Sequence, residues 1–197
     1  TVASCSYDTR KETIVKYVVY PKPANPTLNK DAFCYDGSPV TLSTSAQSPM
    51  WYGSNGNLLS ADSPTYATMY SEAGNYSVQL TQMINGCVSD TTIVPFLISA
   101  IPTPEILGKN KLCANVKETY VVTKSDEKNQ IDWKVTGNKT SYEISRYNTG
   151  FVRDVDWGNE GFDTIYVTET NQYSCVGKKE MPVEVISAPD VSFTAET

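Results

Sequence analysis

Short stretches of alternating apolar and polar residues, each followed by a turn signal, run along most of this chain. Residues 40–42 and 131–135 show the alternation clearly, and a period of two is the pattern of a half-buried strand. Asn85-Gly86 is a hairpin-turn dipeptide between two such stretches. We expect strands near residues 40–42, 50–52, 66–69, 76–80, 88–99, 120–122, 131–135, 151–157 and 164–168, and after residue 175. Short strands with frequent turns favour an all-β sandwich.

A sequence feature recurs about every 80 residues, as expected of an array of similar modules. Cys-x-x-Asp-Thr starts at Cys5 and again at Cys87, and each copy leads through an apolar run and a Pro-x-Pro to another cysteine, Cys34 or Cys113. A weaker copy starts at Cys175. Pro-x-Pro stiffens a connector, so each copy is interpreted as a module end, a stiff linker and the next module start. The expected units are residues 1–20 (the last strand or strands of a preceding module), 24–100, 101–188 and 189–197 (the start of a following module).

The inner pattern of residues 24–100 resembles an immunoglobulin-like domain. Trp51 matches the buried tryptophan of the third strand, and Tyr76 matches the tyrosine corner. One departure is that Cys87 follows Tyr76 by eleven residues, whereas antibody-type domains place the second cysteine two residues after the tyrosine. A Cys34–Cys87 bond would therefore not be the central disulfide between the two sheets.

Residues 101–188 carry Trp133-x-Val-Thr-Gly, then Val155-x-Trp157-Gly, then a Thr-Ile-x-Val-Thr strand and Cys175. This ordered set resembles the PKD-like modules of secreted Bacteroidota proteins. The resemblance implies tandem immunoglobulin-like/PKD-like β-sandwich modules. The expected structural core residues are Trp51, Tyr76, Trp133 and Trp157, and we expect Trp51 and Trp133 to be largely buried.

The same resemblance implies a function without catalysis. Such modules form long chains exported by the type IX secretion system to the outer-membrane surface of Gram-negative bacteria, and many belong to adhesins, including those of gliding motility. The expected role is therefore a structural and adhesive repeat segment that spaces a distal binding element. Its expected partners are neighbouring modules and surface polysaccharide or other cell-surface components. The alternative is an accessory spacer or carbohydrate-binding segment of a secreted polysaccharide- or protein-degrading enzyme.

The five cysteines indicate an oxidising compartment, because they lack zinc or redox-motif spacing. Two pairing schemes fit the spacing. Pairing within modules gives Cys34–Cys87 and Cys113–Cys175 and leaves Cys5 to a preceding module. Pairing across linkers gives Cys5–Cys34 and Cys87–Cys113. We favour the first scheme, since the second requires the linkers to fold back tightly, and each bond would contribute about 3–4 kcal/mol.

Charge and composition narrow the function further. The net charge is −6 with no basic block, which argues against nucleic-acid binding. No apolar run is long enough to span a membrane. The chain contains no histidine, which excludes a Ser-His-Asp or Cys-His arrangement and any His-ligated metal. We expect no enzyme activity, no cofactor and no metal.

Three weaker sequence signals concern calcium binding, sugar binding and glycosylation. Asp154, Asp156 and Glu160 place carboxylates near one turn but lack the spacing of a calcium loop, so a solvated strand edge is the better interpretation. Tyrosines could stack on sugars, but scattered exposure is the simpler expectation for the examples Tyr7, Tyr142 and Tyr147.

Covalent sugar is the more plausible of the carbohydrate hypotheses. Thr91 and Thr164 follow aspartates in the Asp-Thr-aliphatic/Thr pattern of Bacteroidota O-glycosylation, although ordinary strand threonines give the same pattern. In a eukaryotic secretory host, Asn75 and Asn138 would be N-glycosylation acceptors.

Overall fold

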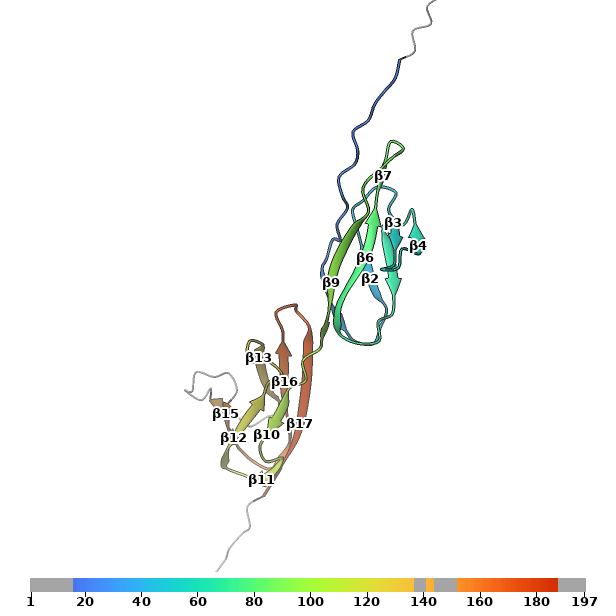
Figure 1. Cartoon of the computed structure of the whole chain (residues 1–197). Helices are drawn as coiled ribbons and strands as arrows, with labels where there is room; N and C mark the ends of the chain where they lie inside the picture. The colour runs from blue at the N-terminus through green and yellow to red at the C-terminus, as the bar shows by residue number, and fades with distance from the viewer. Residues whose placement is uncertain (1–15, 137–140, 144–151, 188–197) are drawn as a thin grey trace, which may run out of the picture.

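Two β-sandwiches lie end to end in the computed structural model, which describes residues 16–136, 141–143 and 152–187 (Figure 1). The strands of the first sandwich lie within residues 32–100 and those of the second within residues 105–186. All regular structure in these described ranges is β-strand. The molecule is therefore elongated and all-β, as the alternating pattern and the proline-rich linker predict.

The first sandwich packs a five-stranded sheet, in the order β1-β9-β6-β3-β4, against the pair β2-β5. Its first strand runs parallel to its last strand, and the other pairings are antiparallel. The hairpin β7-β8 projects from the end that points away from the second sandwich (Figure 1). The strands are β1 (Ala32–Tyr35), β2 (Val40–Ser43), β3 (Met50–Tyr52), β4 (Leu58–Ala61), β5 (Thr65–Thr68), β6 (Gly74–Thr81), β7 (Met83–Ile84), β8 (Cys87–Val88) and β9 (Thr92–Ala100).

The second sandwich has two four-stranded sheets, in the orders β10-β12-β15-β14 and β11-β17-β16-β13. As in the first sandwich, an early strand, β11, runs parallel to the last strand, β17. The strands are β10 (Glu105–Leu107), β11 (Lys111–Cys113), β12 (Val116–Thr123), β13 (Gln130–Thr136), β14 (Ser141–Glu143), β15 (Val152–Trp157), β16 (Gly161–Thr170) and β17 (Val176–Ile186).

Each sandwich has its own hydrophobic core. In the first core Trp51 is fully buried, and its indole N–H donates to the carbonyl of Ser63 at 2.8 Å. Tyr76 is half-buried beside this core, and its hydroxyl donates to the carbonyl of Glu72 at 3.0 Å. This bond back to a residue four positions earlier is the tyrosine corner of immunoglobulin-like sandwiches.

The second core is centred on a different tryptophan. Trp157 is 1% exposed, and its ring meets the ring of the fully buried Tyr120 edge to face at 6.0 Å. Trp133 occupies the strand position that corresponds to Trp51, but it is only half-buried and packs at the margin of this core. Trp133 therefore packs against this core but is less buried than Trp51, because Trp157 and Tyr120 fill the centre.

The described residues before the first sandwich have no sheet to join, so the expected closing strand of a preceding module stays a prediction. The apolar run that ends at Tyr20 predicts a closing strand, yet residues 16–20 form no strand and are exposed. A strand needs a sheet to pair with, and none of the described strands pairs with these residues. Residues 22–29 instead lie along the first sandwich. There the side-chain amide of Gln82 donates to the carbonyl of Ala24 at 2.7 Å, and the hydroxyl of Thr44 donates to the carbonyl of Thr27 at 2.7 Å.

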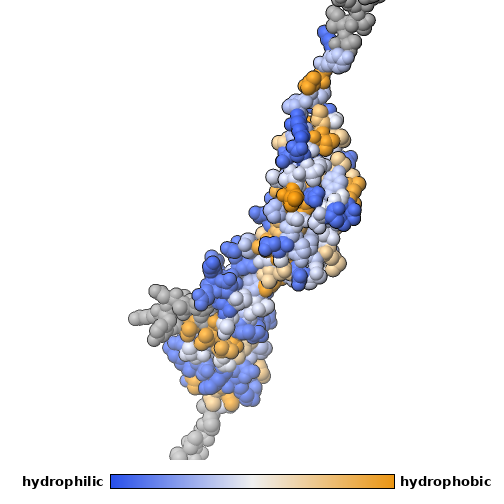
Figure 2. All heavy atoms as spheres, in the orientation of Figure 1, coloured by the Kyte–Doolittle hydropathy of each residue, from blue (hydrophilic) through white to orange (hydrophobic). Residues whose placement is uncertain are grey.

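Apolar side chains are scattered over the face seen in Figure 2, between larger areas of polar residues. The most exposed large apolar side chains in the strands are Phe162, at 83%, and Ile93, at 66%. Scattered exposure of this kind is ordinary for a folded domain. Phe162 lies at the end of the second sandwich that points away from the first (Figure 1).

Candidate functional site at the joint between the sandwiches

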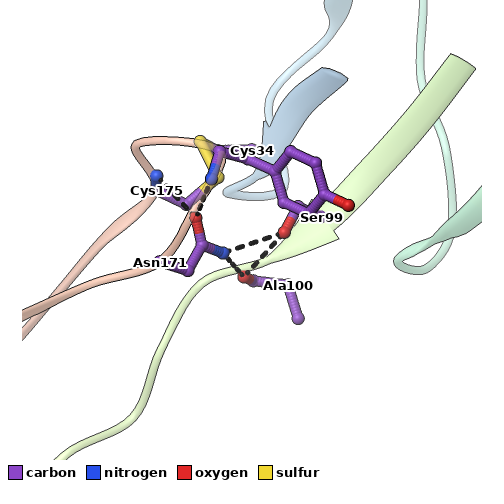
Figure 3. The surroundings of a disulfide bond; sticks show 6 residues. Cys34, Ser99, Ala100, Asn171 and Cys175 are labelled. Atoms are coloured by element: carbon purple, nitrogen blue, oxygen red, sulfur yellow. Dashed lines mark hydrogen bonds between the residues drawn. A yellow bond between two sulfur atoms is a disulfide. The ribbon is translucent and has the colours of Figure 1, made fainter. Parts of the chain in front are cut away.

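A disulfide bond crosses from one sandwich to the other. Cys34, in β1, bonds Cys175, in the turn between β16 and β17 (Figure 3). Their Cα atoms are 5.5 Å apart, within the usual range for a disulfide. The two cysteines are 141 residues apart in sequence, so one covalent link closes a loop that contains most of both sandwiches.

This bond corrects both predicted pairing schemes. Cys34 is not paired with Cys87, and Cys113 is not paired with Cys175; Cys87 and Cys113 are free thiols. The physical reason is position, because in each sandwich the two cysteines lie at opposite ends (Figure 1). The alternative with a Cys5–Cys34 bond fails as well, since Cys34 is already bonded. Cys5 itself lies outside the described residues.

Asn171 reinforces the joint beside the disulfide. Its side-chain nitrogen donates to the hydroxyl of Ser99 at 2.9 Å and to the carbonyl of Ala100 at 3.2 Å, both at the end of β9 (Figure 3). Its side-chain oxygen accepts from the backbone N–H groups of Tyr173, at 2.9 Å, and Cys175, at 3.0 Å. One amide therefore shapes the turn that carries Cys175 and also holds that turn against the first sandwich.

The linker between the sandwiches is built into the second one. Pro102 and Pro104 are buried, and each fixes its own φ near −65°. Gly177, near the start of β17, faces the linker so closely that a Cβ atom there would lie 1.8 Å from the carbonyl oxygen of Pro102. This glycine is required by close approach rather than by an unusual φ, and it lets the linker seat directly on β17.

A buried carboxylate organises the loop that borders the joint. Glu169 is fully buried in β16. It accepts from the backbone N–H and the hydroxyl of Ser125, at 3.0 and 2.9 Å, and from the side-chain amide of Asn129 at 2.7 Å. A buried polar group needs hydrogen-bond partners, and these three bonds fix residues 125–129 between β12 and β13.

Two pockets lie at the joint. The larger, of about 530 Å³, is lined by residues 99–103, 125–129 except Glu127, and 171–173. Asp126 and Lys128 are the charged residues among them. The smaller, of about 390 Å³, lies where Tyr173 of the second sandwich meets the end of the first, at a row that includes Ala32, Asn75 and Leu97.

Three groups that do not line the joint pockets have shifted pKa values. Burial raises the pKa of Tyr120 to about 12, and the hydroxyl donates to the carbonyl of Lys109 at 2.8 Å. Burial, together with Tyr66 and Tyr76, raises the pKa of Tyr70 to about 12. Burial also raises the pKa of Asp163 above its usual value. None of the three lines either joint pocket.

The carboxylates weighed for calcium do not converge. Asp154 accepts from the hydroxyl of Thr119 at 2.7 Å, Asp156 lies 3.8 Å from the ammonium of Lys117, and Glu160 is exposed. Among the described residues no group of three or more His, Cys, Asp or Glu side chains could hold a metal ion. The described ranges also contain no helix long and apolar enough to cross a membrane.

The candidate sugar sites are dispersed. Thr91 is exposed just before β9, whereas Thr164 is half-buried within β16. Asn75 is exposed at the joint. The side chain of Tyr142 is not described, and Tyr7, Asn138 and Tyr147 lie outside the described residues. The structure therefore brings none of the described candidates together.

Sequence reasoning missed the residues that build the joint. Asn171, four residues before Cys175, and Gly177, two residues after it, were not singled out, although Asn is a common turn residue that bonds nearby backbone. The usable signal was the recurrence of one cysteine near the start of each module and one near its end. That spacing allows a bond between modules as readily as a bond within one.

Comparisons with known proteins add little to this geometry. No protein-family model matches the chain, and no curated protein matches it either. Solved structures that align with it include fibronectin(III)-like modules of CbhA from Clostridium thermocellum, at 18% identity and TM-score 0.46, covering 87% of this chain and 100% of that one. Murine CEACAM1b aligns at 11% identity and TM-score 0.34, covering 82% and 99%. The adhesin InvE of Yersinia pseudotuberculosis aligns at 12% identity and TM-score 0.30, covering 82% and 58%. These scores carry no argument on function, so the assignment as a pair of sandwiches rests on strand order and register.

Proposed function

We propose that the chain is a non-catalytic structural segment of a large secreted cell-surface protein, which spaces and presents a binding element located elsewhere in that protein. The observation that carries the proposal is the Cys34–Cys175 bond across the joint. A catalytic or ligand-binding module has no need for such a bond, whereas a spacer that must keep its length and direction under load does. Bonds of this kind are typical of oxidising compartments.

The mechanism follows from the path of the chain. Tension applied at the two ends enters the first sandwich through β1, passes across the disulfide to Cys175, and leaves through β17. The residues between the two cysteines lie outside this covalent path. Most residues of the two cores are therefore shielded from stretching, whereas Val183 and Val185 of β17 lie on the loaded path. The buried prolines and Asn171 keep the joint from bending.

The finer parts of the proposal rest on sequence resemblance. We propose an adhesin of the Bacteroidota type IX-secreted class, attached to the outer membrane, with a role in adhesion or gliding and a PKD-like second module. In the longer protein, residues 1–20 would close a preceding module and residues 189–197 would open a following one. The exposed apolar residues Tyr17 and Val19 support the first of these boundaries, because such side chains favour a covering surface. O-glycosylation at the exposed Thr91 belongs to the same proposal.

Single-molecule stretching of the chain through its two ends tests the mechanism. To prevent other disulfides, the parent for this test carries Cys5→Ser, Cys87→Ser and Cys113→Ser. When oxidised, it should release only the roughly 55 residues outside the 141-residue loop, about 190 Å at 3.3–3.6 Å per residue. Reduction of the disulfide should release the loop and add about 490 Å of chain length at the same length per residue.

The matched control adds Cys175→Ser to this parent, and it should release the full length with or without reductant. An oxidised parent that extends as far as this control would show that the bond does not carry the load, and the spacer mechanism would be rejected.

A further inference from the structure

The two free cysteines occupy the same places in their sandwiches as the two bonded ones. Cys34 comes one residue after Phe33, which packs on the first core, in a strand parallel to the last strand of its sandwich. Cys113 comes one residue after Leu112, which is buried in the second core, in a strand that is likewise parallel to the last one. Cys113 is therefore the counterpart of Cys34 in the second sandwich.

Cys87 is likewise the counterpart of Cys175. Both lie between the last two long strands of their sandwich, at the end that faces the start of the chain (Figure 1). Cys87 sits in the β7-β8 hairpin, where Asn85 and Gly86 form the turn with φ of 53° and 79°. This hairpin is longer than the β16-β17 turn, so Cys87 projects further from its sandwich.

The far end of the second sandwich also repeats the surface that receives Tyr173. In the first sandwich, Leu97 pairs with Ala32 on one side and with Asn75 on the other, and all three line the pocket at Tyr173. The corresponding row in the second sandwich is Lys111, Glu184 and Phe162.

Phe162 thus stands where Asn75 stands at the established joint. It is 83% exposed, more than any other apolar side chain in the strands. A phenylalanine offers a large apolar area, and Phe162 lies on the same sheet and at the same end as the free thiol of Cys113, in the row that matches the one at the established joint.

We propose that each end of this chain is one half of a further joint of the same kind. Cys113 and Phe162 receive the hairpin cysteine and the hairpin side chains of a following sandwich in the same chain. Cys87 presents the hairpin half to a preceding sandwich. The rule is that the first-strand cysteine of one sandwich bonds the hairpin cysteine of the next, so that every joint carries one disulfide.

One alternative is excluded by geometry and a second by the sequence pattern under the proposed rule. Cys87 and Cys113 lie at opposite ends of the elongated molecule, so they cannot bond each other within one chain (Figure 1). Cys5 begins the same Cys-x-x-Asp-Thr pattern as Cys87, so the proposed rule places both in the same class and does not pair them with each other.

Bond formation requires an oxidant, and a donor disulfide of a thiol–disulfide oxidoreductase supplies it. The Cys113 thiolate attacks the donor disulfide, which forms a mixed disulfide and releases one donor thiolate. The hairpin thiolate of the next sandwich then displaces the second donor sulfur. Two protein thiols are thereby oxidised to one disulfide, and the donor leaves as a dithiol that takes up the two protons.

Two variants of the chain test the pairing, with a second copy standing in for the neighbouring sandwich. One variant, Cys5→Ser/Cys87→Ser, keeps Cys113 free. The other, Cys5→Ser/Cys113→Ser, keeps Cys87 free. After an equimolar mixture equilibrates in glutathione buffer and is quenched by alkylation, random pairing would make half of all disulfide-linked dimers mixed. The proposal predicts an excess over random pairing: the mixed Cys113–Cys87 dimer should outnumber either homodimer several-fold beyond the twofold ratio that random pairing gives.

Matched substitutions then identify the surface. Phe162→Ser in the Cys113 variant should abolish the excess of mixed dimer. Ile93→Ser in the same variant removes a comparably exposed side chain on the first sandwich, far from Cys113, and should leave the excess intact. A mixed fraction of half or less, or an excess that survives Phe162→Ser, overturns the proposal.

Non-reducing peptide mapping of the longer natural protein gives an independent answer. The proposal predicts one peptide in which Cys113 is linked to a cysteine that follows residue 187. It predicts a second peptide in which Cys87 is linked to a cysteine that precedes residue 16 and is not Cys5. Recovery of both as free thiols, or of a Cys5–Cys87 peptide, contradicts the rule. In either case an intact Cys34–Cys175 peptide would leave the proposed spacer function standing, so failures of the two proposals are distinguishable.

Discussion

Replacing Gly177 with alanine should loosen the joint while leaving both cores folded. A Cβ atom at this position would lie 1.8 Å from the carbonyl oxygen of Pro102 and 2.6 Å from the carbonyl carbon. Both are backbone atoms of the linker, so no side-chain rotation relieves the overlap. The linker must move by more than an ångström away from β17, which pulls on Asn171 and on Cys175.

The size of the effect follows from packing energetics. Overpacking of this kind typically costs about 1–3 kcal/mol. Since about 1.4 kcal/mol corresponds to a tenfold change in an equilibrium constant, the Cys34–Cys175 bond should become roughly 5- to 150-fold easier to reduce. The cost falls on the joint, because Gly177 contacts the linker and not either hydrophobic core.

The assay is the equilibrium between the disulfide and a graded glutathione buffer, read by alkylation and mass. Gly74→Ala is the matched control, because Gly74 also lies near a strand end but a Cβ there would meet only the ring of Tyr76 at an ordinary 3.6 Å. The control should titrate like the parent. If Gly177→Ala also titrates like the parent, within about twofold, the linker is not seated on β17 and the rigid joint is wrong.

Three further predictions concern the sandwiches themselves. Trp51→Ala should lower the free energy of unfolding of the first sandwich by about 3–5 kcal/mol, because Trp51 is fully buried. Trp133→Ala should lower the free energy of unfolding of the second sandwich clearly less, since Trp133 is half-buried. Equal losses in urea titrations would contradict the two core assignments. Glu169→Gln should cost about 1.5–3 kcal/mol through weaker bonds to residues 125–129, and amide exchange in that loop should accelerate; unchanged exchange would count against the anchoring role. The pKa of Tyr120 is raised from 10.0 to about 12 in the folded chain, so its contribution to stability is present below pH 10 and is lost as the pH rises from 10 toward 12; Tyr120→Phe should flatten this decline in denaturant titrations, and an unchanged slope would show that Tyr120 does not cause it.

Much of the fold was predictable because it depends on local patterns. The hairpin turn at Asn85-Gly86 follows from the ability of these residues to adopt positive φ. The tyrosine corner at Tyr76 and the buried Trp51 follow from their spacing. Each of these features is specified within a few residues of sequence.

The joint was not predictable in the same way, because it is set by which ends of two sandwiches meet. Cys34 and Cys175 are 141 residues apart, and the preference for a bond within each module came from the tight fold-back that the alternative scheme would require of the linkers. Only the strand order shows that the two cysteines of a sandwich lie at opposite ends. The half-burial of Trp133 has a similar cause, since the competing Trp157 comes from the opposite sheet.

Non-reducing peptide mapping of the 197-residue chain tests the central claim most directly. After thiols are blocked and the oxidised chain is digested, the account predicts one disulfide-linked peptide that joins Cys34 to Cys175, with Cys87 and Cys113 recovered in blocked form. Recovery of Cys34 joined to Cys87, or of Cys113 joined to Cys175, would place the bonds within the sandwiches and contradict the clamped joint.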